Sequence, residues 1–363
     1  SETPCECVRV GDGAFWILRP PRQDESGHAF GIVDEAGKIN LNAATLDMLN
    51  QLPGITGDVA AAIVDWRDSD NEATADGAES EAYLLLDSPY ACKDAPFETV
   101  EELFLVRGVT RALMFGRDLN RNGVMDPEEA ERAAEGVTTA GAGETERGIA
   151  HWVTVYSAEP NTDANDQARV DVNGSPELIN VLQQGLEAGR VPTVAAQVRR
   201  ARPFRNLVDF YLRSGLTAAE FAQVEDRLTT RRETTTRGLV NVATAPREVL
   251  RCLPDLDDSD AAALVSKRAD LTTNAASLAW IAEALPPEKA VSVGDVATTR
   301  SFQYSADILA VSGDGRAFKR YRAVIDTRAS PPNVVYWKDL TALGWPLSEE
   351  LRKSLRQGYL KQE

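Results

Sequence analysis

The residues best suited to chemistry lie in one acidic stretch, residues 118–129, which reads DLNRNGVMDPEE. It fits the calcium loop pattern D-x-[DN]-x-[DN]-G-x5-E at every defined position. Calcium prefers six to eight hard oxygen ligands, and this spacing supplies them from side chains and one backbone carbonyl. The predicted Ca²⁺ ligands are Asp118, Asn120, Asn122, the carbonyl of Val124, Asp126 (directly or through water) and Glu129. The alternative is a polar turn between two helices.

A second acidic run follows the C-terminal end of a predicted helix, in residues 65–79. Carboxylates this dense at a helix C-terminus oppose the macrodipole and repel one another. A cation would relieve both penalties, so Asp68, Asp70 and Glu79 are candidate ligands of a second Ca²⁺. The alternative is a solvated acidic loop.

The elements that position these residues include a repeated unit. The strand-to-helix phrase at 38–49 recurs at 169–179 and at 239–250, which indicates internal duplication. In the first copy Asn42 is the predicted N-cap. Arg111–Gly116 is predicted to close the helix entering the calcium loop, and Pro127 to begin the one leaving it.

Residues 41–64 resemble a helix-hairpin-helix. DNA-binding versions grip a phosphate with backbone N–H groups and nearby basic residues. Here Asp47, Asp58 and Asp65 surround the hairpin, and the third copy is more acidic still. A phosphate would meet uncompensated carboxylates, so the hairpin is interpreted as scaffold.

Composition narrows the function classes. The 363 residues carry 39 Lys+Arg against 56 Asp+Glu, a formal net charge of −17, which argues against nucleic-acid binding. There is no glycine-rich phosphate loop, G-x-S-x-G elbow or H-E-x-x-H, so no enzyme class is indicated. The four cysteines permit disulfides or free buried thiols, and a bridge from Cys5 or Cys7 to Cys92 is predicted if disulfides form.

Short apolar runs predict strands at 13–18 and 29–33, and alternating apolar residues predict strands at 302–310 and 321–325. The predicted fold class is α+β, an antiparallel sheet from both ends with a large helical insert of helix-hairpin-helix-like repeats. The predicted divisions are 1–42 with 290–340 (sheet), 43–135 (first helical module), 136–168 (linker and strand), 169–289 (two further repeats) and 341–363 (amphipathic tail).

Six segments stand out together and in a characteristic order. They are Asp34–Asn42, Ile63–Asp70, Gly77–Glu79 with Tyr83, Pro89-Tyr90, Val100–Leu103 and Arg107–Val109. In this order they resemble the minor pseudopilin K family of type II (general) secretion systems. The similarity is clear over about residues 10–115 and looser beyond. The calcium loop at 118–129 and the repeat at 169–186 depart from the family pattern.

The resemblance implies a pilin-like sheet and a non-enzymatic subunit at the periplasmic tip of the pseudopilus. Its implied partners are other minor pseudopilins and the major pseudopilin, and its relatives bind calcium in the helical domain. The resemblance also implies an N-terminal hydrophobic helix that anchors the full-length protein in the inner membrane. No stretch of about 20 apolar residues occurs here and the chain starts at Ser1, so that helix is expected to be missing. The alternative functions are a DNA-uptake receptor and, more weakly, a hydrolase of a secreted polymer.

Overall fold

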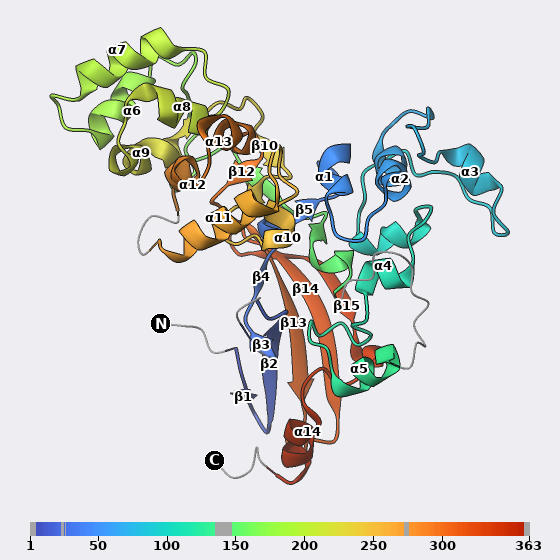
Figure 1. Cartoon of the computed structure of the whole chain (residues 1–363). Coiled ribbons are helices and arrows are strands. Elements are labelled where there is room, and N and C mark those ends of the chain that lie inside the picture. Colours follow the sequence, from blue (N-terminus) through green and yellow to red (C-terminus); the bar gives the residue numbers. More distant parts are fainter. Residues whose placement is uncertain (1–4, 23–24, 26, 135–146, 272–275, 359–363) are drawn as a thin grey trace.

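A computed structural model describes residues 5–22, 25, 27–134, 147–271 and 276–358 (Figure 1). Strands from both chain ends share its largest sheet. These are β1 (Val8–Val10), β2 (Gly13–Arg19), β3 (Ala29–Phe30), β4 (Val33–Asp34), β13 (Gln303–Val311), β14 (Phe318–Asp326) and β15 (Asn333–Asp339). The order is β1-β2-β13-β14-β15, with β3 beside β2 and β4 beside β13, and every pairing is antiparallel. A mixed helix and sheet fold with an antiparallel sheet is therefore confirmed.

The C-terminal helix α14 (Glu349–Arg356) packs on the end of this sheet beside the β13–β14 turn (Figure 1). Burial alternates along β2, so that Ala14, Trp16 and Leu18 point to the same side. They cluster with Leu309 of β13 and with Leu355 of α14. The edge strand β15 was not predicted as a strand, although its Val, Tyr and Trp residues are typical of one.

The first helical module follows β4. It comprises η1 (Glu35–Gly37), β5 (Ile39–Asn40), α1 (Leu46–Asn50), α2 (Gly57–Arg67), α3 (Ser80–Leu84), η2 (Val100–Leu105), α4 (Arg111–Phe115) and α5 (Pro127–Ala134). The helices on either side of the calcium loop begin and end as predicted, because α4 is capped by Gly116 and α5 starts at Pro127.

The second helical region returns to the sheet at β13. In chain order it comprises η3 (Ile149–His151), β6 (Val153–Thr154), β7 (Ala158–Pro160), β8 (Val170–Asp171), α6 (Leu178–Gly185), α7 (Val191–Ala201), α8 (Leu207–Ser214), α9 (Ala218–Val224), η4 (Glu225–Arg227), β9 (Leu228–Thr229), β10 (Thr235–Arg237), β11 (Val240–Asn241), α10 (Arg247–Leu250), α11 (Asp258–Ala269), η5 (Leu278–Trp280), α12 (Ile281–Ala284), α13 (Pro287–Gly294) and β12 (Ala297–Thr298). A 3-10 turn, η6 (Thr341–Leu343), follows β15.

The repeated phrase adopts the same local structure each time. Its strands β5, β8 and β11 pair in parallel with β6, β9 and β12 respectively. In the first two copies an asparagine side chain exchanges two hydrogen bonds with the backbone of a distant phenylalanine, Asn42 with Phe97 and Asn173 with Phe204. The prediction that Asn42 caps α1 is wrong. The N-cap is Thr45, and the Asn42 side chain is engaged by Phe97 instead.

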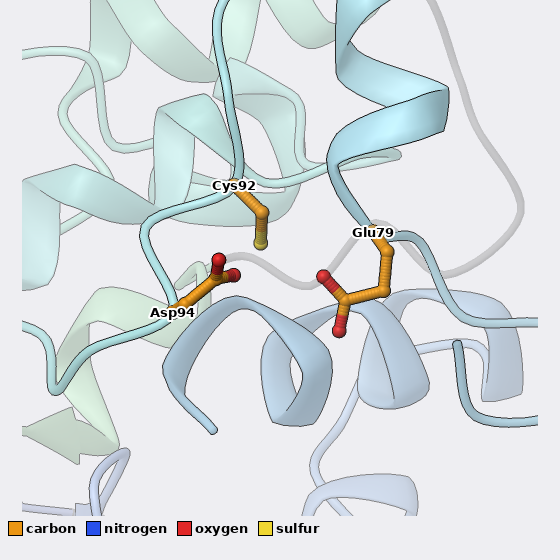
Figure 2. A group of neighbouring side chains, drawn as sticks. All are labelled: Glu79, Cys92 and Asp94. Atoms are coloured by element: carbon orange, nitrogen blue, oxygen red, sulfur yellow. The ribbon is translucent and has the colours of Figure 1, made fainter. Parts of the chain in front are cut away.

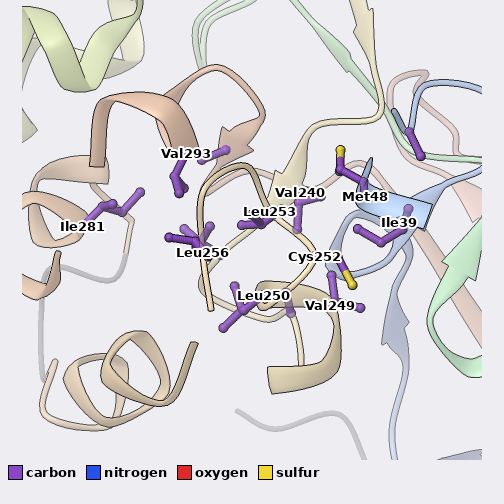
Figure 3. Close-up of a cluster of buried hydrophobic side chains, with 14 of the residues drawn as sticks. Ile39, Met48, Val240, Val249, Leu250, Cys252, Leu253, Leu256, Ile281 and Val293 are labelled. Carbon is purple, nitrogen blue, oxygen red and sulfur yellow. The ribbon is translucent and has the colours of Figure 1, made fainter. Parts of the chain in front are cut away.

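The helical modules share a hydrophobic core, shown in part in Figure 3. Ile39 and Met48 of the first repeat lie near Val240 and Val249 of the third. Residues 136–146 of the predicted linker lie outside the described residues. Among the described residues, no helix has the length and hydropathy needed to cross a bilayer.

Cys92 and Cys252 are buried free thiols. The predicted bridge from Cys92 to Cys5 or Cys7 is therefore wrong. Cys92 lies in the first helical module, where its Sγ donates to the carbonyl of Asp65 at 3.7 Å, whereas Cys7 packs beside the sheet.

Candidate cation sites

The loop between α4 and α5 folds around its first aspartate. Oδ1 and Oδ2 of Asp118, which is 2% exposed, accept hydrogen bonds from the N–H groups of Asn122 (3.0 Å) and Gly123 (2.8 Å). The N–H of Val124 donates to Oδ1 of Asn122 at 2.7 Å. Gly123 has a φ of +82°, and a Cβ there would lie 2.8 Å from Cα of Pro20. Both conformation and packing therefore require glycine at this position of the loop.

Glu129 closes the loop from the first turn of α5. Its Oε1 accepts from the N–H of Asn120 at 3.1 Å, and its Oε2 accepts from the N–H of Asp126 at 3.1 Å. Oδ2 of Asp126 accepts from the side-chain amides of Asn120 (2.6 Å) and Asn122 (3.0 Å). The structure thus brings together the side chains that the sequence singled out in this loop.

The donor chemistry of this loop suits a hard cation. Burial raises the pKa of Glu129, and the nearby charge of Asp118 adds to the effect. Burial also opposes ionisation of Asp118, but the hydrogen bond and charge of His151, whose Nε2 lies 3.4 Å from Oδ2, hold its pKa below the usual value. Among the described residues, Asp118, Asp126 and Glu129 are not a group with ligand oxygens all within 4.8 Å of one another. A bound Ca²⁺ would therefore need the asparagine and carbonyl oxygens as well.

A buried arginine, which sequence reasoning did not single out, connects the loop to the sheet. Arg320 of β14 is 0% exposed, and its Nε and Nη2 donate to Asp307 of β13 at 3.0 and 2.6 Å. Its Nη1 donates to the carbonyl of Asn120 at 2.6 Å, and its Nη2 to that of Arg121 at 2.9 Å. The guanidinium therefore joins two strands to the calcium loop.

The second candidate site lies between α2 and α3. Asp65, Asp68 and Glu79 each offer a ligand atom, and these atoms lie within 4.8 Å of one another. Glu79 belongs to a second such group with Cys92 and Asp94, and Figure 2 shows these three side chains converging. We call these five residues the Glu79 cluster.

The Glu79 carboxylate is the group in this cluster that most needs a positively charged partner. Glu79 is only 5% exposed, and neither of its oxygens has a hydrogen-bond partner in the described part of the chain. Burial, followed by the negative charges of Asp65 and Asp94, raises its pKa to about 6. A buried Oδ1 of Asp68 is likewise without a partner among the described residues. A buried carboxylate without a hydrogen-bond partner destabilises the folded state, and a bound divalent cation would offset that loss. These residues therefore fit a divalent cation.

The cluster differs from the predicted set. Asp70 lies outside both groups; it is exposed, and its Oδ1 accepts from the N–H of Glu72 at 2.9 Å. Asp65, which is fully buried, takes part instead and also accepts from the N–H of Thr74 at 3.1 Å. The spacing of Asp65 and Asp68, three apart at the end of α2, could have indicated a shared face.

Several basic residues near the hairpins between α1 and α2 and between α10 and α11 already have partners within the chain. Arg247, at the start of α10, is paired with Asp258, and Lys289 is paired with Asp260. Arg67 and Arg268 donate to backbone carbonyls of the neighbouring strand-to-helix turns.

Comparison with known proteins gives one family. The family model described as Type II secretion system (T2SS), protein K matches residues 34–115, which confirms the resemblance seen in the sequence. No curated protein matched the chain. A similar solved structure is a chain in the crystal structure of the GspK-GspI-GspJ complex from the enterotoxigenic Escherichia coli Type 2 Secretion System. The two are 10% identical with a TM-score of 0.43, over 93% of this chain and 83% of that one.

Proposed function

We propose that this chain, whose residues 34–115 match the type II secretion protein K family, is a minor pseudopilin that supports protein export in the periplasm. The family match carries this proposal. In it the chain has a structural role and caps the pseudopilus tip with other minor pseudopilins, above the major pseudopilin. The sheet built from both chain ends, with a long helical insert, is consistent with that role.

Co-purification tests the assembly. The chain, mixed at micromolar concentration with the other minor pseudopilins of its own secretion system, is expected to elute with them as one complex in size-exclusion chromatography. The major pseudopilin alone serves as the comparison, because a tip subunit should prefer the other tip subunits. Separate elution at every tested concentration would contradict the proposal.

We also propose that calcium stabilises this subunit at two places. In the loop at 118–129, bound Ca²⁺ would neutralise Asp118, Asp126 and Glu129 and would strengthen a connection that Arg320 makes to the sheet. At the Glu79 cluster, the cation would neutralise buried carboxylates that lack partners. No nucleic acid is involved in this proposal.

Substituting the first and the last candidate ligands of the 118–129 loop tests the first of these sites. A ligand that binds only the folded state adds about 2.7 kcal/mol at a concentration 100 times its Kd. The double substitution Asp118→Ala and Glu129→Ala is expected to remove most of the loop's share of the Ca²⁺-induced rise in melting temperature, measured against EGTA by calorimetry. Glu131→Ala, an exposed carboxylate on the same helix, should keep the full rise. An undiminished rise in the double variant would refute the loop as a site.

A further inference from the structure

The first helical module exposes a run of leucines. Leu84, Leu85 and Leu86 lie at and just beyond the end of α3 with exposures of 55%, 84% and 45%. Figure 1 places α3 at the periphery of the molecule, away from the large sheet. Burying apolar side chains is favourable, so three consecutive exposed leucines mark a surface suited to an apolar partner.

The chain just before these leucines is held by the buried side chain of Tyr83. Tyr83 is buried, its ring stacks on that of Tyr90 at 5.4 Å, and its hydroxyl accepts from the N–H of Arg107 at 3.3 Å. The Tyr90 hydroxyl donates to the carbonyl of Leu105 at 2.8 Å, and Leu105 is itself 44% exposed. We call Leu84, Leu85, Leu86 and Leu105 the leucine surface.

The surroundings of the leucine surface are strongly acidic. Residues 68–106 carry Asp or Glu at positions 68, 70, 72, 76, 79, 81, 87, 94, 98, 101 and 102, whereas the basic residues within or next to this segment are Arg67, Lys93 and Arg107. The Arg107 guanidinium donates to the carbonyl of Asp76. Lys93 is already paired with Glu102 at 2.7 Å. Glu81 and Asp87 are exposed on either side of the leucines. A partner must therefore offer apolar side chains together with positive charge.

We propose that the leucine surface docks an amphipathic helix of another protein, apolar on one face and rich in Lys or Arg at its edges. Such a helix would bury the leucines and place its cations against Glu81, Asp87 and their acidic neighbours. The chain's own amphipathic helix α14 is not the occupant, because its Leu355 is buried against the sheet. This inference does not depend on the assignment as a pseudopilin.

A model peptide tests the proposal with the whole chain. The probe is a labelled synthetic helix of Leu and Lys in amphipathic order, and its counterpart has Glu in place of each Lys. Binding of the Lys peptide is followed by fluorescence anisotropy. Leu85→Ser with Leu86→Ser is expected to weaken that binding about tenfold or more, as the loss of about 1.4 kcal/mol would do. Leu212→Ser, a 37% exposed leucine on α8, is the matched control and should bind as the wild type does.

Serine at an exposed position is expected to leave the free energy of unfolding nearly unchanged. The melting temperature of each variant is compared with that of the wild type to show that the variant is folded. Equal affinity in the double variant and the wild type would overturn the proposal, as would equal binding of the Glu peptide. Binding to anionic vesicles that depends on Leu85 and Leu86, without peptide binding, would also overturn it, since the surface would then serve a membrane.

Discussion

Glu79→Gln is expected to change stability in opposite directions with and without calcium. In EGTA the variant should unfold at a higher temperature than the wild type, because a buried charge without a partner, repelled by Asp65 and Asp94, has been removed. In saturating Ca²⁺ the order should reverse, since an amide is a weaker ligand than a carboxylate. Calorimetry in the two buffers measures both differences.

The same carboxylate predicts how stability without metal depends on pH. The pKa of Glu79 is raised from 4.5 to about 6 in the folded protein, so between these values the folded state holds more protons than the unfolded state. The contribution of Glu79 to the free energy of unfolding should therefore be greatest below pH 4.5 and should fall by about 2 kcal/mol as pH rises through 6. Ca²⁺ should suppress that fall, and Glu79→Gln should remove it.

Asp70→Asn separates the observed Glu79 cluster from the predicted set of Asp68, Asp70 and Glu79. Because Asp70 is exposed and lies outside the cluster, its variant should keep the calcium response of the wild type. Loss of the response in Asp70→Asn, with retention in Glu79→Gln, would show that the cation binds elsewhere in the acidic run.

The two candidate sites differ in how far the sequence could define them. The candidate ligands of the 118–129 loop all lie within one twelve-residue segment, so their spacing alone selects them. The Glu79 cluster is made by tertiary packing. Asp65 comes from α2, Glu79 precedes α3, and Cys92 with Asp94 comes from the following loop. Proximity along the chain favoured Asp70, but the turn after α2 directs it to solvent.

The fold was predictable where periodicity is strong and local. The repeated strand-to-helix phrase adopts one geometry. The strand β13 forms where its alternating residues predict it, but it buries the polar residues Ser305 and Asp307 and leaves Ala310 exposed, because polar partners lie on that face of the sheet. The edge strand β15 was missed because it exposes apolar residues such as Val334 and Trp337 and so lacks a polar and apolar alternation. Asn42 was assigned to the wrong role because its partner, Phe97, is distant in the sequence.

Arg320→Met is expected to be the most destabilising single change outside the hydrophobic core. It leaves Asp307 buried without its closest cation and removes the donor to the carbonyls of Asn120 and Arg121. Breaking a buried pair in this way costs about 3–5 kcal/mol. Arg322→Met is the matched control: Arg322 reaches the same carboxylate at 3.4 Å but its side chain is 36% exposed, so its loss should cost less than about 1 kcal/mol. Urea unfolding of both variants measures the difference, and equal costs would contradict it.

The role of Arg320 in the calcium loop can be separated from its role in stability. Replacing both partners, Asp307→Leu with Arg320→Met, removes the unpaired charge and should recover most of the lost stability. The carbonyls of Asn120 and Arg121 would still lack their donor, so the Kd of the loop for Ca²⁺, measured by calorimetric titration, should stay weaker than in the wild type. Since coupling between binding and folding is reciprocal, Ca²⁺ should also stabilise this double variant less. A double variant that regains both stability and wild-type Ca²⁺ affinity would mean that Arg320 supports the sheet alone.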